Sequence, residues 1–114
     1  MKLVELTLPC YDQHRVVTAV QVTDHFAIHD TVGGRPSISV THTPTLRRMA
    51  IVEGLAVGIA ACEAWRRTGI DWSFSDPTGL VAVPEDRKEM ARHIRDFAES
   101  GALDVLRSFA EAHA

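Results

Sequence analysis

Six histidines are the residues of this chain best suited to metal binding or acid–base chemistry. His25 and His29 are four residues apart, a spacing at which two imidazoles on a helix can bind one metal ion. The alternating residues around them predict a strand instead, on which positions four apart share a face but lie roughly 13 Å from each other. Zinc–nitrogen bonds are about 2 Å long, so we expect no metal ion at this pair.

Two His–Asp neighbours, Asp24–His25 and His29–Asp30, suggest general acid–base chemistry. Adjacent residues on a strand point to opposite faces, so a working pair would have to form across strands. An enzyme with a His/Asp site is therefore an alternative in which His25, His29 or His42 meets a carboxylate at hydrogen-bonding distance. No complete catalytic or cofactor motif accompanies these residues, so we expect a protein that is not an enzyme and binds no cofactor.

Nucleic-acid binding is a second alternative, and it depends on a set of basic and aromatic residues. The adjacent glycines before Arg35 favour a plain hairpin turn, although such a turn can also form a backbone nest for a phosphate. Scattered surface arginines are common, but these could follow the phosphates of a single strand while rings stack on its bases. The candidate residues are Arg15, Arg35, Arg47, Arg48, His25 and His29.

The leading hypothesis is a small non-enzymatic protein that binds another protein. Trp72 and Phe74 lie in a loop with Asp71 and Asp76, and aromatic residues often anchor protein interfaces. The same aromatic side chains could instead cover the edge of the core. We take Trp72, Phe74, Asp71 and Asp76 as the candidate partner-binding residues.

A stripe of small residues suggests a second contact surface. Ala50, Gly54, Gly58 and Cys62 recur at helical spacing, and such a smooth face lets a helix approach a neighbour closely. Packing within the chain is the ordinary use of this pattern, and a homodimer contact is the alternative. The segment is apolar on more than one side, which favours an oligomer or partner surface.

Length, composition and charge favour one small folded domain over residues 1–114. The chain has 114 residues, of which 46% are hydrophobic and 24% charged, close to average globular usage. Residues 1–52 carry five basic groups against four acids, and residues 53–114 carry seven against eleven, which gives the net charge of −3. This balance argues against a generally basic DNA-coating protein and leaves the first half as the less acidic surface.

The expected location is the cytoplasm. Two cysteines, Cys10 and Cys62, are too few for a disulfide framework and lie among apolar residues, which indicates buried reduced thiols. Glu5 interrupts the first apolar residues, so no signal peptide is indicated. The most apolar segment, residues 49–65, contains acids and glycines and is too short to cross a membrane.

The first half of the chain is predicted to form strands. Residues 3–8 and 15–22 alternate or are rich in β-branched side chains, and the second run continues to residue 29 as one long bent strand or as two strands separated by a bulge near Asp24. A hairpin loop is predicted over residues 31–36, followed by a strand over 37–41 whose Ser37, Ser39 and Thr41 form an exposed face. Residues 43–45 predict a turn rather than a helix start, and residues 46–52 a further strand.

The second half predicts helices over residues 54–67, from Pro84 to Ser100 and over residues 103–110. Between the first two lies a loop, with a short extended piece at residues 81–83. The expected fold is α+β: an antiparallel sheet of four to five strands packed against two to three C-terminal helices. This order of strands and helix resembles the topology of the Whirly and transcriptional-coactivator single-strand DNA binders, without a shared motif. Residues 40–45 resemble segments of small prophage reading frames, which implies a phage-type inhibitor or adaptor.

Overall fold

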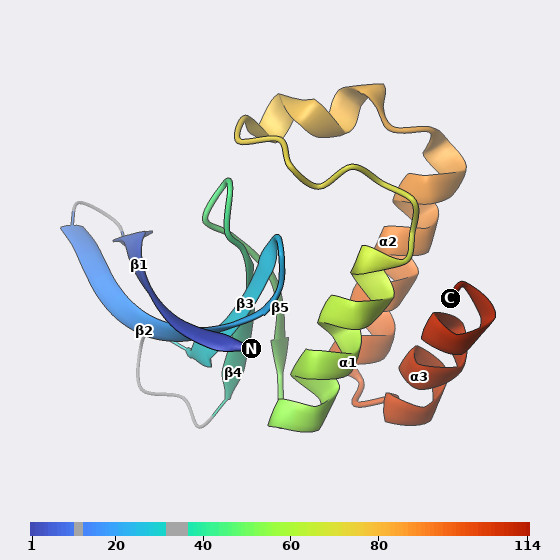
Figure 1. The fold of residues 1–114 in the computed structure, drawn as a ribbon, viewed down its shortest axis with the longest axis horizontal. Helices are drawn as coiled ribbons and strands as arrows, with labels where there is room; N and C mark the ends of the chain where they lie inside the picture. Colours follow the sequence, from blue (N-terminus) through green and yellow to red (C-terminus); the bar gives the residue numbers. More distant parts are fainter. Residues whose placement is uncertain (11–12, 32–36) are drawn as a thin grey trace.

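A five-stranded antiparallel sheet forms the first half of the protein and three α-helices form the second (Figure 1). The computed structural model describes residues 1–10, 13–31 and 37–114. The strands follow one another in the sheet in the order of the chain: β1 Lys2–Cys10, β2 Gln13–Thr23, β3 Phe26–Asp30, β4 Ile38–His42 and β5 Arg47–Val52. The helices are α1 Leu55–Arg66, the 3₁₀ helix η1 Pro77–Ala82, α2 Glu85–Glu99 and α3 Leu103–Ala112. The predicted α+β fold is confirmed.

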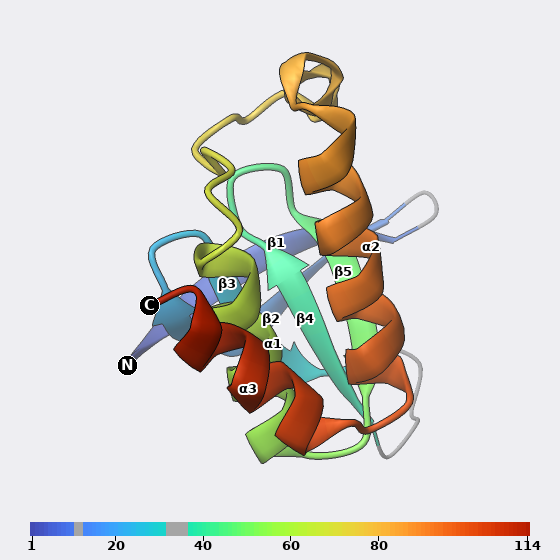
Figure 2. The same cartoon turned by 90° about the vertical axis from the view of Figure 1, so that its right-hand side faces the viewer.

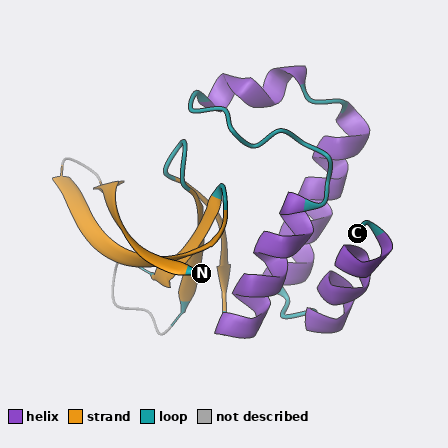
Figure 3. Ribbon diagram, viewed as in Figure 1, coloured by secondary structure: helices purple, strands orange, loops and turns teal. Residues whose placement is uncertain are grey.

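The main core lies between one face of the sheet and the helices, which all lie on that side (Figure 3). Phe26, Val40 and Val52 point from the strands toward α1, and Trp65 meets them from the helix with no exposed surface. In Figure 2, α2 runs alongside the edge strand β5. This arrangement brings residues near position 48 beside residues near position 92, although the sequence separates them widely.

The chain reverses at Asp24–His25, where the sequence predicts either one long bent strand or two strands separated by a bulge. The single long strand is wrong. Two strands do meet here, but they are antiparallel neighbours joined by a turn at these two residues rather than by a bulge. Aspartate favours such turns, and a register shift between Gln21 and Thr23 accompanies this one. The alternation continues across the turn because Val20 pairs with Ile28, which keeps both on the core face.

The opposite face of the sheet is covered by its own first hairpin. Figure 1 shows β1 and β2 curving away from the helices, and this curvature forms a second apolar cluster of Leu6, Leu8, Ala19 and Ala27. The predicted exposure of the polar residues on β4 is therefore wrong for Ser39 and Thr41, whose exposed fractions are 3% and 1%.

The other strands and helices predicted from the sequence are confirmed, whereas most of the hairpin loop predicted over residues 31–36 lies outside the described residues. Residues 43–46 form a turn and lead into β5, and α2 begins directly after Pro84. The extended piece predicted over residues 81–83 is wrong for Val81 and Ala82, because η1 continues to Ala82, whereas Val83 has an extended backbone. Asp76 caps η1 by accepting a hydrogen bond from the backbone N–H of Thr78 at 3.0 Å.

The small-residue stripe packs inside the molecule. A Cβ atom added to Gly58 would lie 3.3 Å from the side chain of Ile28, so α1 rests almost directly on the sheet. Ala50 and Cys62 are also buried, and burial raises the pKa of the Cys62 thiol to about 12. These three residues are therefore used for intramolecular packing, the ordinary use of small residues. The predicted helical stripe is wrong for Ala50, which lies in β5, and Gly54 precedes the first turn of α1.

Candidate anion-binding cleft

A cleft of about 490 Å³ between β5 and α2 collects basic side chains from two distant parts of the sequence. Its lining includes five cationic residues: Arg47 and Arg48 from β5, and Lys88, Arg92 and Arg95 from α2. No carboxylate lines the cleft among the residues that the structure describes. A chain with a net charge of −3 thus presents one concentrated positive surface.

The local structure of α2 and β5 explains this convergence. Lys88, Arg92 and Arg95 are four and then three residues apart, which places them on one face of a helix. On β5, a register shift pairs Arg48 with Thr41 and Ala50 with Val40, so Met49 is an extra residue in the strand. The contact of α2 with β5 then brings the two basic sets to the same cleft.

The cations of the cleft are weakly neutralised. Arg92 pairs with Glu85 at 2.8 Å and Arg95 with Glu99 at 3.3 Å. Arg92, Glu85 and Arg95 are more than half exposed, whereas Glu99 is 38% exposed and also accepts a hydrogen bond from the backbone N–H of Ile51 at 3.2 Å. Exposed pairs of this kind contribute at most about 1 kcal/mol and exchange readily for other partners. Arg47, Arg48 and Lys88 make no ion pair with any described residue. The cleft can therefore accept a multiply charged anion.

The floor of the cleft is apolar and rigid. Trp65 and Trp72 contribute to it but are only 0% and 4% exposed, so their rings support the floor and are not free to stack on a ligand. The indole N–H of Trp72 donates to the carbonyl oxygen of Trp65 at 2.9 Å, and that of Trp65 donates to the carbonyl oxygen of Ala91 at 3.1 Å. These bonds fix α1 against α2 and the following loop.

The predicted partner-binding residues separate into buried and exposed pairs. Trp72 lies in the core and Phe74 is half-buried, with its ring centre 4.8 Å from that of His42. Asp71 and Asp76 are exposed, and hydrogen bonds from Ser73 and Thr78 hold the pKa values of their carboxyl groups below the usual range. The aromatic rings thus cover the core, and the two carboxylates order the loop that carries them.

The predicted nucleic-acid residues are also divided. Arg47 and Arg48 lie in the cleft, whereas Arg15 is exposed on the β1–β2 hairpin opposite Leu8. His25 occupies the turn between β2 and β3, and Arg35 lies outside the described residues. Lys88, Arg92 and Arg95 were not among the predicted site residues, although their helical spacing is visible in the sequence.

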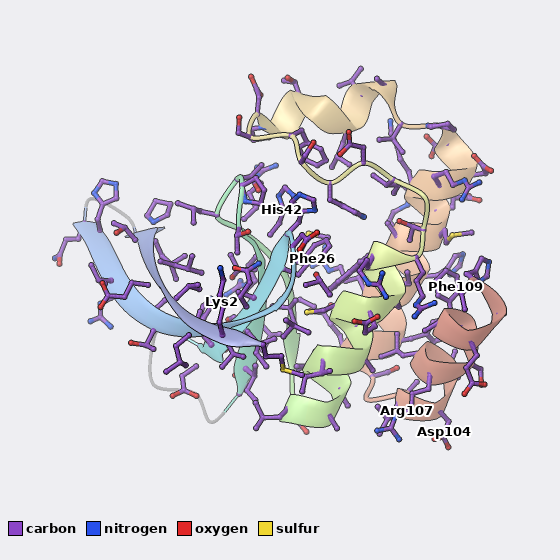
Figure 4. All side chains as sticks on the ribbon, viewed as in Figure 1. Lys2, Phe26, His42, Asp104, Arg107 and Phe109 are labelled. Carbon is purple, nitrogen blue, oxygen red and sulfur yellow. The ribbon has the colours of Figure 1, made fainter. Side chains whose placement is uncertain are left out.

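His29 and His42 make hydrogen bonds to hydroxyl groups and backbone carbonyls rather than to carboxylates. His42 is 2% exposed and lies with Phe26 between the sheet and the helices (Figure 4). Its Nε2 donates to the carbonyl oxygen of Trp72 at 2.7 Å, and its Nδ1 therefore accepts from the hydroxyl of Thr45, also at 2.7 Å. Across residues 1–10, 13–31 and 37–114, no hydrogen bond joins His25, His29 or His42 to a carboxylate, and no cluster of three or more potential metal ligands occurs.

The burial of His42 predicts a loss of stability at mildly acidic pH. Desolvation lowers the pKa of this imidazole from 6.5, outweighing the opposing effect of the Trp72 carbonyl, and the charge of His25 lowers it further. Below pH 6.5 the unfolded chain therefore binds a proton that the folded chain does not. The free energy of unfolding should fall as the pH decreases from 6.5 to the lowered pKa, by up to about 1.4 kcal/mol per pH unit.

Urea unfolding at about pH 7.5 and about pH 5.5 measures this loss. We expect His42→Gln to show a smaller difference between the two pH values than the wild-type protein. An equal difference in both proteins would assign the pH dependence to other groups.

Comparison with known protein families, curated proteins and solved structures found no match. Within the described part of the chain, no helix has both the length and the apolar character needed to span a bilayer. Function must therefore be inferred from the geometry of the site.

Proposed function

We propose that this protein binds single-stranded nucleic acid and that the cleft between β5 and α2 holds its phosphate backbone. The observation that supports this proposal best is the convergence of five cationic side chains on a cleft without a lining carboxylate among the described residues. Charge-assisted hydrogen bonds from arginine to phosphate are strong and need no particular base sequence.

The spacing of the cations favours a polymer over a single small anion. Lys88 and Arg95 lie roughly 10 Å apart along α2, because a helix rises about 1.5 Å per residue. A nucleic-acid strand carries one phosphate for every ~3.4 Å of duplex axis, so this wall can reach more than one phosphate. Arg47 and Arg48 contact the same nucleic-acid strand from β5, on the opposite side of the cleft.

The surroundings of the cleft favour a single strand over a duplex. The cationic side chains lie within a concave site of about 490 Å³, and the rest of the chain is acidic enough to give a net charge of −3. A duplex is a wide rod with charge on all sides and would meet these acids as well as the cleft. A flexible single strand can enter the cleft alone.

Fluorescence anisotropy of a labelled single-stranded oligonucleotide across a salt series tests this function. We expect the logarithm of the association constant to fall linearly with the logarithm of salt concentration, with a slope between roughly −2 and −3.5 for three to five phosphate contacts. A duplex of the same length should bind more weakly. The absence of salt-dependent binding to any single-stranded DNA or RNA would contradict the proposal.

A protein partner is the second candidate, and a separate groove favours it. The groove lies between α2 and α3, has a volume of about 350 Å³ and is mainly apolar. Phe97 and Val105 line the groove, and their side chains are 38% and 44% exposed. Asp86 and Glu89 also border it. A second copy of the chain, or the target of a phage-type inhibitor in the cytoplasm, could cover this surface.

Light scattering after size-exclusion chromatography tests the first of these partners. A homodimer through the groove should become monomeric in Phe97→Glu. A wild-type monomer would leave the groove to a different protein, and a dimer unaffected by Phe97→Glu would place the dimer contact elsewhere.

A further inference from the structure

A second, polar cavity lies on the face of the sheet that does not meet the helices. It has a volume of about 340 Å³ and reaches the edge strand β5 from the other side. Polar residues of β3 and β4 line it together with apolar residues of β1 and the β4–β5 turn, and two arginines border it: His29, Ser39, Thr41, Leu8, Pro9, Leu46, Arg48 and Arg95.

This cavity is continuous in its lining with the cationic cleft. Arg48 and Arg95 line both spaces, one from β5 and the other from α2. A nucleic-acid strand whose phosphates contact these two arginines therefore has the polar cavity on one side and the cationic cleft on the other.

The polar side chains of the cavity are buried and have fixed directions. His29, Ser39 and Thr41 are 7%, 3% and 1% exposed. His29 Nδ1 lies 2.9 Å from the carbonyl oxygen of Asp30, so this nitrogen carries the proton and donates. His29 Nε2 then accepts from the hydroxyl of Thr41 at 2.8 Å.

These bonds leave defined hydrogen-bonding capacity toward the cavity. The Thr41 hydroxyl donates its proton in the hydrogen bond to His29, and its oxygen can still accept a hydrogen bond from a ligand. The Ser39 hydroxyl is 3.0 Å from that of Thr31, which in turn accepts from Ser37 at 3.1 Å. Because the proton of Ser37 is donated to Thr31, the Thr31 proton is free to go to Ser39, whose own proton can then be donated to a ligand.

The walls complement this polar floor. Leu8, Pro9 and Leu46 supply apolar surface of the kind that contacts the faces of a flat ring. β1, which carries Leu8 and Pro9, curves together with β2 away from the helices (Figure 1), and both residues line the cavity. A flat ring with donors and acceptors at its edge fits such a site better than an aliphatic or a purely charged ligand.

We infer that the polar cavity receives one unstacked base of the strand whose backbone lies in the cleft. This inference rests on the proposed nucleic-acid function and adds a base contact to it. The phosphates beside the base lie near Arg48 and Arg95, and the base edge meets the hydroxyl groups of Ser39 and Thr41. A single unpaired base can enter this cavity, whereas a paired base has its edge already occupied.

Binding of the wild-type protein to two matched oligonucleotides tests the base contact. One oligonucleotide carries bases, and the other has the same number of phosphates with abasic sites throughout its central part. We expect the base-bearing strand to bind about tenfold more tightly, which corresponds to about 1.4 kcal/mol, with similar salt dependence for both. Equal affinities would overturn the base pocket and leave the phosphate-binding function intact, whereas no binding of either strand at low salt would overturn both.

A substitution in the cavity tests whether the preference for the base-bearing oligonucleotide arises there. Ser39→Ala removes one hydroxyl from the floor and should reduce the preference for the base-bearing strand several-fold, with little change for the abasic strand. Ser108→Ala, an exposed change on α3, is the matched control and should keep the full preference. A full tenfold preference in folded Ser39→Ala would place the base contact outside this cavity and overturn the inference.

Discussion

Replacing both Arg47 and Arg48 by alanine should weaken binding of single-stranded oligonucleotides by about 30-fold at low salt. Each of the two lost phosphate contacts contributes about 1 kcal/mol to the binding free energy, and their sum corresponds to this loss of affinity. The slope of the logarithmic salt dependence should become less negative by about 1.4, because each phosphate contact on a single strand contributes about 0.7. Fluorescence anisotropy across a salt series gives both quantities for the same protein.

A matched control separates the cleft from the total charge. Arg66→Ala with Arg107→Ala removes the same number of charges from α1 and α3, and Arg107 lies away from the sheet (Figure 4). This control should lose little affinity. Equal losses in the two double variants would contradict binding in the cleft and indicate a general effect of charge.

The opposite wall of the cleft gives an independent check. Lys88→Ala with Arg95→Ala should weaken binding to a similar extent, because both residues face Arg47 and Arg48 across the cleft. A loss confined to the β5 arginines would mean that α2 takes no part in binding.

Trp65→Ala should cause the largest loss of stability among the single substitutions considered. The Trp65 side chain has no exposed surface, and its ring stacks on Phe26 with 5.5 Å between the centres. Its indole N–H also donates to the carbonyl oxygen of Ala91 on α2. Removing a fully buried aromatic side chain costs about 3–5 kcal/mol, a large part of the roughly 5–15 kcal/mol that stabilises a typical domain.

Urea unfolding of three variants tests this role of Trp65. Trp65→Phe keeps an aromatic ring but loses the hydrogen bond, so we expect an intermediate cost. Phe97→Ala, at a position that is 38% exposed, should cost much less than Trp65→Ala. A similar cost for Trp65→Ala and Phe97→Ala would contradict the central position of Trp65 in the core.

The strands and helices were predictable because their residue patterns are local. Alternation identified the strands, and Pro84 and Gly101 marked the ends of α2. The turn at Asp24–His25 was missed because a two-residue reversal between paired strands preserves the alternation on both sides. Sequence period alone does not distinguish this turn from a continuous strand.

The candidate site was only partly predictable because it depends on contacts between distant segments. Arg47 and Arg48 were identified, but their neighbours Lys88, Arg92 and Arg95 became evident only when α2 was placed beside β5. Ser39 and Thr41 alternate with apolar residues as on an exposed strand, and the curvature of β1 and β2 is what buries them. That curvature has no signature in the residues of β4.

The most direct test of the central claim is an NMR titration of the isotopically labelled protein with a single-stranded oligonucleotide at low salt. The account predicts that backbone amide signals of β5 around Arg47 and Arg48, and of α2 between Lys88 and Arg95, shift first and most. Signals of α3 and of the groove around Phe97 and Val105 should change little. Shifts centred on that groove, or no shifts at all, would contradict nucleic-acid binding in the cleft.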